Sequence, residues 1–194
     1  RRLTLKVDGR FAGNLDQLPE YQNVPVIVDK LLTVVGDLSY TNVRSSLGNV
    51  DQEKGQRWSF VVREDVVAET LFTKLRGRYD LGVQLPLAHS SIWVRNAAGF
   101  SPQSRIEPFA NFYFGAFGNN YVDHKDEQRY REYQSLPGLE INEAGGRNFV
   151  KSMVELNLPP LRFDRFGTSG FYVPWMRTAL FAGGLATNLD DRRA

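Results

Sequence analysis

The sequence predicts an all-β protein, and more narrowly an antiparallel transmembrane β-barrel. Three observations predict it: long runs in which apolar and polar residues alternate, run lengths of about 10 residues or more, and a long polar loop beside short turns. Strands of soluble proteins average about 5–6 residues, whereas tilted membrane-spanning strands need about 9–11. The chain starts at Arg1 without methionine. We therefore expect residues 1–194 to form a single barrel domain, a fragment of a larger barrel with roughly eight strands present.

Composition narrows the class of protein. The chain has 194 residues, of which 42% are hydrophobic, and a mean hydropathy of −0.37. No apolar run approaches the roughly 20 residues of a membrane helix, which excludes a helical membrane protein. Composition does not exclude a β-barrel, because the polar residues that face a barrel's interior lower its average hydropathy. Cysteine is absent, and 24 basic residues are interspersed with 22 acidic ones. The sequence therefore indicates neither disulfides nor a nucleic-acid partner.

Alternation of apolar and polar residues predicts three strands in the first part of the chain, at residues 3–11, 32–44 and 56–63. Turn-forming residues make 13–30 a connection, and 45–55 is a polar loop. Each of the three runs therefore has one apolar face and one polar face.

Residues 63–74 form the one segment with helical character. Acidic residues stand early in it and Lys74 ends it, which is the charge order that a helix dipole favours. An ordinary loop of this length fits the segment equally well, and both alternatives stay open.

The cleanest alternation lies at residues 75–85, and a second run follows at 91–100 after the short connection 86–90. In the first run, apolar side chains such as Leu81 lie opposite charged ones. The charged residues of the two runs are Arg76, Arg78, Asp80 and Arg95. The three arginines either line a polar lumen and favour anions there, or form the wet face of a soluble sheet.

Residues 108–188 organise the rest of the chain. A strand-like aromatic run at 109–117 precedes a long polar loop at 119–146, and two more strand-like runs follow, at 148–158 and 171–185. The polar face of the run 148–158 comprises Lys151, Glu155 and Asn157. In the run 171–185 the larger residues Val173, Trp175, Ala179, Phe181 and Leu185 share one side, opposite small ones such as Ala182. Apolar faces are expected to meet lipid.

The order of these features resembles the C-terminal barrel of the bacterial surface antigen (BamA-like) family. The stretches that carry the resemblance are Asn111-Phe-Tyr-Phe-Gly-Ala-Phe-Gly118, Arg129-Tyr-Arg-Glu-Tyr-Gln-Ser-Leu-Pro-Gly138, Val154-Glu-Leu-Asn-Leu-Pro159 and Arg177-Thr-Ala-Leu-Phe-Ala-Gly-Gly184. The resemblance implies a protein of the bacterial outer membrane that acts in outer-membrane protein or lipid assembly or in transport. Its implied partners are outer-membrane lipids, with periplasmic domains or assembly proteins as further candidates.

The same resemblance implies a loop lock, in which an arginine of the long loop enters the lumen and pairs with acidic residues on the next two strands. Arg129 or Arg131 would be that arginine, and Glu155 the first acidic partner. The second acidic position falls near Ala182, and Arg-Tyr-Arg-Glu stands where the family has Arg-Gly-aromatic. The charged residues expected to face the lumen are Arg76, Arg78, Asp80, Arg95 and Lys151.

No residue pattern indicates catalysis or a cofactor. His89 and His124 have no paired spacing that would hold a metal, and Asp123-His124 lacks a serine in a Gly-x-Ser-x-Gly turn. We therefore expect a protein that is not an enzyme. A soluble periplasmic β-sandwich or lipocalin-like binding protein is the alternative, in which Glu155 is a solvated strand residue. A membrane-anchored hydrolase is a third class, without a nucleophile arrangement to support it.

Overall fold

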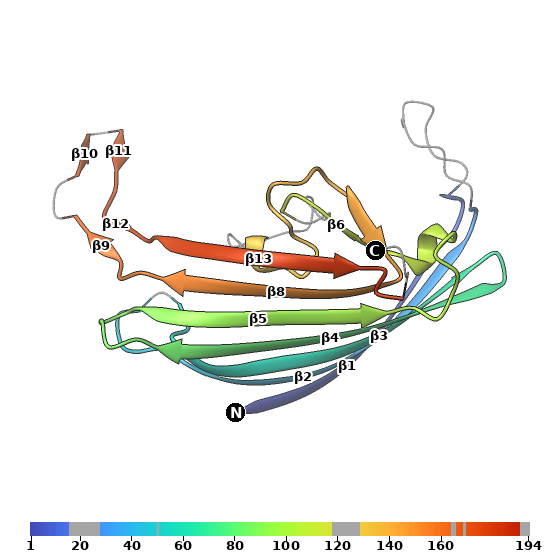
Figure 1. The fold of residues 1–194 in the computed structure, drawn as a ribbon, viewed down its shortest axis with the longest axis horizontal. Helices are drawn as coiled ribbons and strands as arrows, with labels where there is room; N and C mark the ends of the chain where they lie inside the picture. The colour runs from blue at the N-terminus through green and yellow to red at the C-terminus, as the bar shows by residue number, and fades with distance from the viewer. Residues whose placement is uncertain (16–27, 50, 118–128, 164–165, 169, 191–194) are drawn as a thin grey trace.

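The computed structural model describes residues 1–15, 28–49, 51–117, 129–163, 166–168 and 170–190, and its main feature is one large antiparallel sheet (Figure 1). Seven strands form this sheet in the order β1-β2-β3-β4-β5-β8-β13. Their bounds are Arg2–Ala12 (β1), Leu31–Arg44 (β2), Lys54–Val67 (β3), Thr70–Gln84 (β4), Ser91–Phe100 (β5), Asn148–Asn157 (β8) and Ala179–Thr187 (β13). The prediction of an all-β, antiparallel protein is therefore confirmed. Within the described ranges β1 and β13 are the free edges of the sheet.

The remaining elements are short. They are the 3₁₀ turns η2 (Pro108–Ala110) and η3 (Arg129–Arg131), and the strands β6 (Phe112–Phe114), β7 (Ala144–Gly146), β9 (Leu161–Arg162), β10 (Gly167–Thr168), β11 (Phe171–Tyr172) and β12 (Trp175–Met176). These strands form two-stranded pairs, β6 with β7, β9 with β12 and β10 with β11. In the described part of the chain, no helix has the length and apolar character needed to cross a membrane.

The two faces of the main sheet differ in chemistry, because successive side chains of a strand point to opposite sides. On one side, which we call the exposed face, large apolar side chains are open to solvent, among them Leu5, Val83 and Val154. The opposite side, which we call the covered face, bears buried polar and charged residues such as Asp80 and Glu155. The sheet therefore has its apolar side outward and its charged side inward.

Residues 101–117 and 129–147, which belong to the connection from β5 to β8 and which we call the covering segment, lie over the covered face. Phe112 and Phe114 of this segment are buried against Phe149 of β8, with ring centroids 4.9 and 4.7 Å from that of Phe149. A side chain on Gly99 of β5 would collide with Phe149 and Phe112, so the absence of a Cβ there lets the rings lie against the sheet. This aromatic cluster fixes the segment over β5 and β8.

The structure replaces the helical or loop segment expected at residues 63–74 with a β-hairpin, so both of those expectations are wrong. β3 continues to Val67, β4 begins at Thr70, and only Ala68 and Glu69 form the turn. Both turn residues have positive φ, 45° and 66°, which is the backbone of a type I′ hairpin turn. This type of turn usually contains Asn or Gly. Since neither residue is present at 68–69, the turn has no signature in the sequence.

Three other expectations need correction. The aromatic run 109–117 does not supply a strand of the main sheet, because only Phe112–Phe114 is extended and it pairs with β7. Of the run 171–185, only the part from Ala179 onward joins the main sheet. Its larger side chains also point to the side opposite to that expected. Phe181 stacks on Tyr130 of the covering segment, and Leu185 packs against the aromatic cluster around Phe149.

Candidate functional site

A charged network spans the covered face, and Asp80 of β4 is its first centre. Strand pairing places Asp80 between Arg57 of β3 and Arg95 of β5. The carboxylate is fully buried and accepts hydrogen bonds from Arg57 Nε at 2.6 Å, Arg95 Nη1 at 3.1 Å and Arg78 Nη2 at 2.9 Å. Three guanidinium groups therefore converge on one carboxylate.

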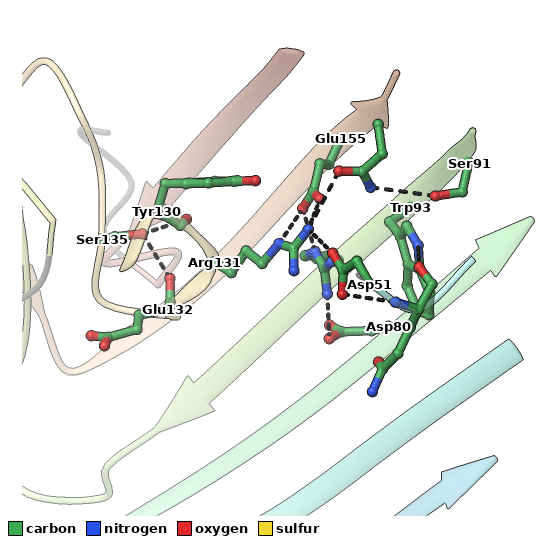
Figure 2. A network of polar contacts seen from close by, with 12 residues as sticks. Asp51, Asp80, Ser91, Trp93, Tyr130, Arg131, Glu132, Ser135 and Glu155 are labelled. Carbon is green, nitrogen blue, oxygen red and sulfur yellow. Dashed lines mark hydrogen bonds and ion pairs between the residues drawn. The ribbon is translucent and has the colours of Figure 1, made fainter. Parts of the chain in front are cut away.

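Glu155 of β8 is the second centre, and it is also fully buried. Arg95 donates from Nε to Glu155 at 2.8 Å, so this arginine joins the two centres. Arg131 of the covering segment approaches Glu155 from above the sheet, as Figure 2 shows. It donates through Nε at 2.9 Å to one carboxylate oxygen and through Nη2 to the other. This two-pronged geometry is the strongest that an arginine forms with a carboxylate.

The third centre is Asp51, in the connection between β2 and β3. Arg131 Nη2 donates to it at 2.6 Å, and Arg177, which precedes β13, does so at 2.7 Å. Burial raises the pKa of Asp51, but the charge and hydrogen bond of Arg131 outweigh burial and hold the pKa below its ordinary value. For Arg131, burial lowers the pKa, but the hydrogen bonds and charges of Glu155 and Asp51 raise it further. The Asp51–Arg131 pair is therefore ionised over the whole physiological range.

The network alternates in sign along its length. It contains five guanidinium groups and three carboxylates, so its net charge is +2. A buried carboxylate without a partner is costly, whereas each of these accepts hydrogen bonds from at least two arginines. The arrangement is suited to holding chain segments in one place, because its ion pairs join separate parts of the chain. All three of its carboxylates are occupied by arginines, so none of them is available as a base.

Lys151 of β8 holds the covering segment at a second point. Its ammonium group is buried and donates to the backbone carbonyls of Glu132 at 2.9 Å and Tyr133 at 3.2 Å, and also to that of Ser135. Arg78 adds a hydrogen bond to the Arg131 carbonyl at 3.2 Å. Residues 131–135 are thus held by the sheet through their backbone as well as through the Arg131 side chain.

A third contact region lies where the β2–β3 connection meets β5. The buried carboxylate of Glu53 accepts a hydrogen bond from the Ser46 amide at 2.8 Å and lies 3.2 Å from His89 Nδ1. Burial raises the pKa of Glu53, but the hydrogen bonds of Ser46 and His89 bring it below its ordinary value. Trp93 donates from its ring to the carbonyl of Gln52 at 3.1 Å. These contacts position Asp51 within reach of Arg131.

The structure brings together most of the residues proposed from the sequence. Arg131 contacts Glu155, and the charged strand residues Arg76, Arg78, Asp80, Arg95 and Lys151 all lie on the covered face. Arg76 stands apart from the network, with its guanidinium 4.0 Å above the Tyr133 ring.

Several sequence proposals find no place in this network. Ala182 points to the exposed face, because it pairs with Val154, and the residue opposite Glu155 is Phe181. The Arg129 side chain, Asp123 and His124 lie outside the described residues.

Sequence reasoning missed three members of the network. Arg57, which contacts Asp80, lies on the polar side of the run 56–63 but was not singled out as a site residue. Asp51 lies 80 positions before Arg131 and 126 positions before Arg177, in a loop without periodicity. Arg177 stood in a stretch that carried the family resemblance, but nothing marked it as a site residue. A loop carboxylate becomes recognisable only when the fold places it beside unpaired guanidinium groups.

Among the described residues, no group of three or more potential metal-ligating side chains occurs. No protein-family model matches the chain, and no curated protein or solved structure matches it either. The functional conclusion therefore depends on the chemistry of the two sheet faces and on the charged network.

Proposed function

We propose that this chain is part of an outer-membrane β-barrel of the bacterial surface antigen (BamA-like) type. In this proposal the exposed face meets lipid, the covered face meets a polar lumen, and residues 129–135 are the inward-folded loop. The activity would be outer-membrane protein or lipid assembly, or transport, without a cofactor and without covalent chemistry. Its partners would be outer-membrane lipids and periplasmic domains or assembly proteins.

The observation that carries the proposal is the distribution of polarity across the sheet. Leu5 and Val83 on the exposed face are 71% and 57% accessible, whereas Asp80 and Glu155 on the covered face are 0% accessible. Soluble proteins bury apolar residues and rarely bury carboxylates. A sheet with lipid on one side and a polar lumen on the other has the distribution seen here, because its apolar side is stabilised by lipid.

The loop contacts give the proposal further support. The resemblance implied that an arginine of the long loop pairs with a strand carboxylate, and Arg131 lies against Glu155 in this way. The soluble β-sandwich alternative calls for a second sheet packed on an apolar face. In the described residues only two-stranded pairs accompany the main sheet, and the face that is covered is the charged one.

A matched pair of substitutions on β2 tests the proposal. Leu38 and Ser39 are neighbours near the middle of the strand, and they point to the exposed and the covered face respectively. Leu38→Arg would place a charge in lipid and cost about 2–4 kcal/mol of folding free energy. Ser39 lies beside Thr4 and Ser59 on the covered face. Ser39→Arg therefore places its charge among polar side chains, and it is expected to cost less than about 1 kcal/mol of folding free energy.

The measurement is the free energy of folding of the full protein into lipid vesicles, with heat-dependent gel mobility as the check for a folded barrel. Equal costs for the two variants would show that the faces have been assigned wrongly. Recovery of the native protein in the soluble fraction, without a mobility shift, would overturn the membrane proposal and favour the soluble binding protein.

A further inference from the structure

A cavity of about 250 Å³ lies between the main sheet and the covering segment. Arg63 of β3 and Lys74 of β4 face each other across the strand pair, and Arg76 lies two positions further along the same face. Asn111 and Tyr133 of the covering segment also line the cavity. Three cationic side chains therefore meet at one partly enclosed space.

The positive charge of this cavity is only partly neutralised. Arg63 pairs with Asp65 at 2.8 Å, and Asp65 also accepts a hydrogen bond from Thr33 at 2.6 Å. Lys74 donates to a backbone carbonyl, that of Asn111, at 3.2 Å, and Arg76 stacks on the Tyr133 ring. Within the part of the chain that the structure describes, neither Lys74 nor Arg76 forms an ion pair.

This arrangement differs from that of the charged network, where every arginine contacts a carboxylate. A carbonyl and an aromatic ring stabilise a cation but add no negative charge. The nearby carboxylate Asp65 also acts on Lys74, but it is paired with Arg63. Two such cations beside one cavity favour a ligand with two negative charges, and a guanidinium group matches the geometry of phosphate oxygens.

Asn111 adds a second requirement for the ligand, a hydrogen-bond donor. Its amide nitrogen donates to the carbonyls of Arg105 at 2.8 Å and Glu107 at 3.4 Å, which fixes the orientation of the side chain. Its side-chain oxygen is buried and has no hydrogen-bond partner. A buried acceptor in this state is stabilised by a donor, and a hydroxyl group of a ligand supplies one.

We propose that this cavity binds a phosphomonoester that also carries hydroxyl groups. The phosphate interacts with Lys74 and Arg76, and a hydroxyl group donates to the side-chain oxygen of Asn111. A soluble sugar phosphate and a phosphorylated lipid headgroup share this chemistry. The inference goes beyond the proposed function and does not depend on it, because the cavity is formed by the sheet and the covering segment and requires no lipid.

Calorimetric titration of the folded full-length protein with glucose 6-phosphate tests this site at constant ionic strength. We expect binding to be tighter than for inorganic phosphate, which lacks the hydroxyl groups, and tighter than for glucose, which lacks the charge. Lys74→Gln and Arg76→Gln should each weaken binding about tenfold or more, as expected for the loss of one charge-assisted hydrogen bond. Lys54→Gln is the control, because Lys54 is exposed on β3 and lies away from the cavity.

The source of the ligand is distinguished by a second titration with phosphatidic acid in detergent micelles, compared with phosphatidylcholine. Binding of phosphatidic acid alone assigns the site to a lipid headgroup, and binding of glucose 6-phosphate alone assigns it to a soluble metabolite. The proposal is overturned if the unaltered protein binds neither phosphomonoester. It is also overturned if Lys74→Gln and Arg76→Gln proteins with unchanged circular dichroism bind as tightly as the unaltered protein.

Discussion

Glu155 is the residue through which the network joins the sheet to the segment that covers it. It receives hydrogen bonds from Arg95 within the sheet and from Arg131 above the sheet. Removing its charge would leave two guanidinium groups in a buried region without their shared carboxylate. The cost of the change therefore comes from two buried arginines that each lose one of their two carboxylate partners, as much as from the lost hydrogen bonds.

We expect Glu155→Gln to lower the free energy of unfolding by about 3–5 kcal/mol, the range for breaking a buried ion pair by removing one partner. Equilibrium denaturation in urea measures this. Asp8→Asn is the control, because the Asp8–Arg10 pair at the sheet edge is open to solvent and should contribute less than about 1 kcal/mol. A similar effect of both substitutions would mean that Glu155 is solvated in the folded protein.

Gly82 on β4 is a second position where one substitution should lower the stability of the protein, here without any change of charge. A Cβ at this position would collide with the ring of Trp93 on β5, which is itself almost completely buried. Gly82→Ala should therefore cost about 1–3 kcal/mol through overpacking. Gly77→Ala on the same strand meets no atom within 4 Å and should leave stability within about 0.5 kcal/mol of the original. The measurement is the unfolding midpoint of each variant. A lower midpoint for Gly82→Ala than for Gly77→Ala is expected, and equal midpoints would show that Trp93 does not pack closely against Gly82.

At the scale of elements, the hairpin between β3 and β4 explains why one segment was predicted wrongly. The acidic residues before the turn and the lysine after it followed the charge order of a helix. The actual turn consists of Ala68 and Glu69, which carry none of the usual turn signals. Strand pairing on both sides outweighs the local preference of these two residues.

The positive φ angles of Ala68 and Glu69 strain the backbone of this turn, and this gives a prediction for the hairpin. Replacing Ala68-Glu69 by Asn-Gly supplies residues that adopt positive φ at low cost, so stability should rise by about 0.5–1 kcal/mol. Refolding should be unchanged or faster. The same Asn-Gly pair at 87–88, in the connection between β4 and β5, serves as the control and should bring no comparable gain. A loss of stability at 68–69 would show that the turn has another geometry.

Strand facing was predictable from sequence wherever alternation continued without interruption, because the period of two is a local property of an extended chain. In β5, for example, Trp93 and Arg95 lie on the covered face and Ile92 and Val94 on the exposed face, as the pattern indicated. In β13 both faces contain apolar or small residues, so the prediction that Phe181 faces lipid depended on residue size rather than on polarity, and it was wrong. The partner of Phe181, Tyr130, comes from a distant segment, which only the fold reveals.

At the scale of the whole molecule, the charged network joins parts of the chain that are remote in sequence. Arg131 contacts Glu155 on β8 and Asp51 in the β2–β3 connection, and Asp51 also contacts Arg177 before β13. The alternation predicted the individual strands and their charged side. It did not predict which loops close over that side, because loop contacts depend on side chains that meet only after the sheet has formed.

The order of strands in the main sheet also limits how any barrel that contains it can close. Each of the six neighbouring strand pairs is antiparallel, so six reversals of direction separate β1 from β13. These two edge strands consequently point the same way, as their common direction in Figure 1 also shows. A ring of strands in which every neighbour is antiparallel requires an even total. Closure through antiparallel contacts therefore demands an odd number of further strands between β13 and β1.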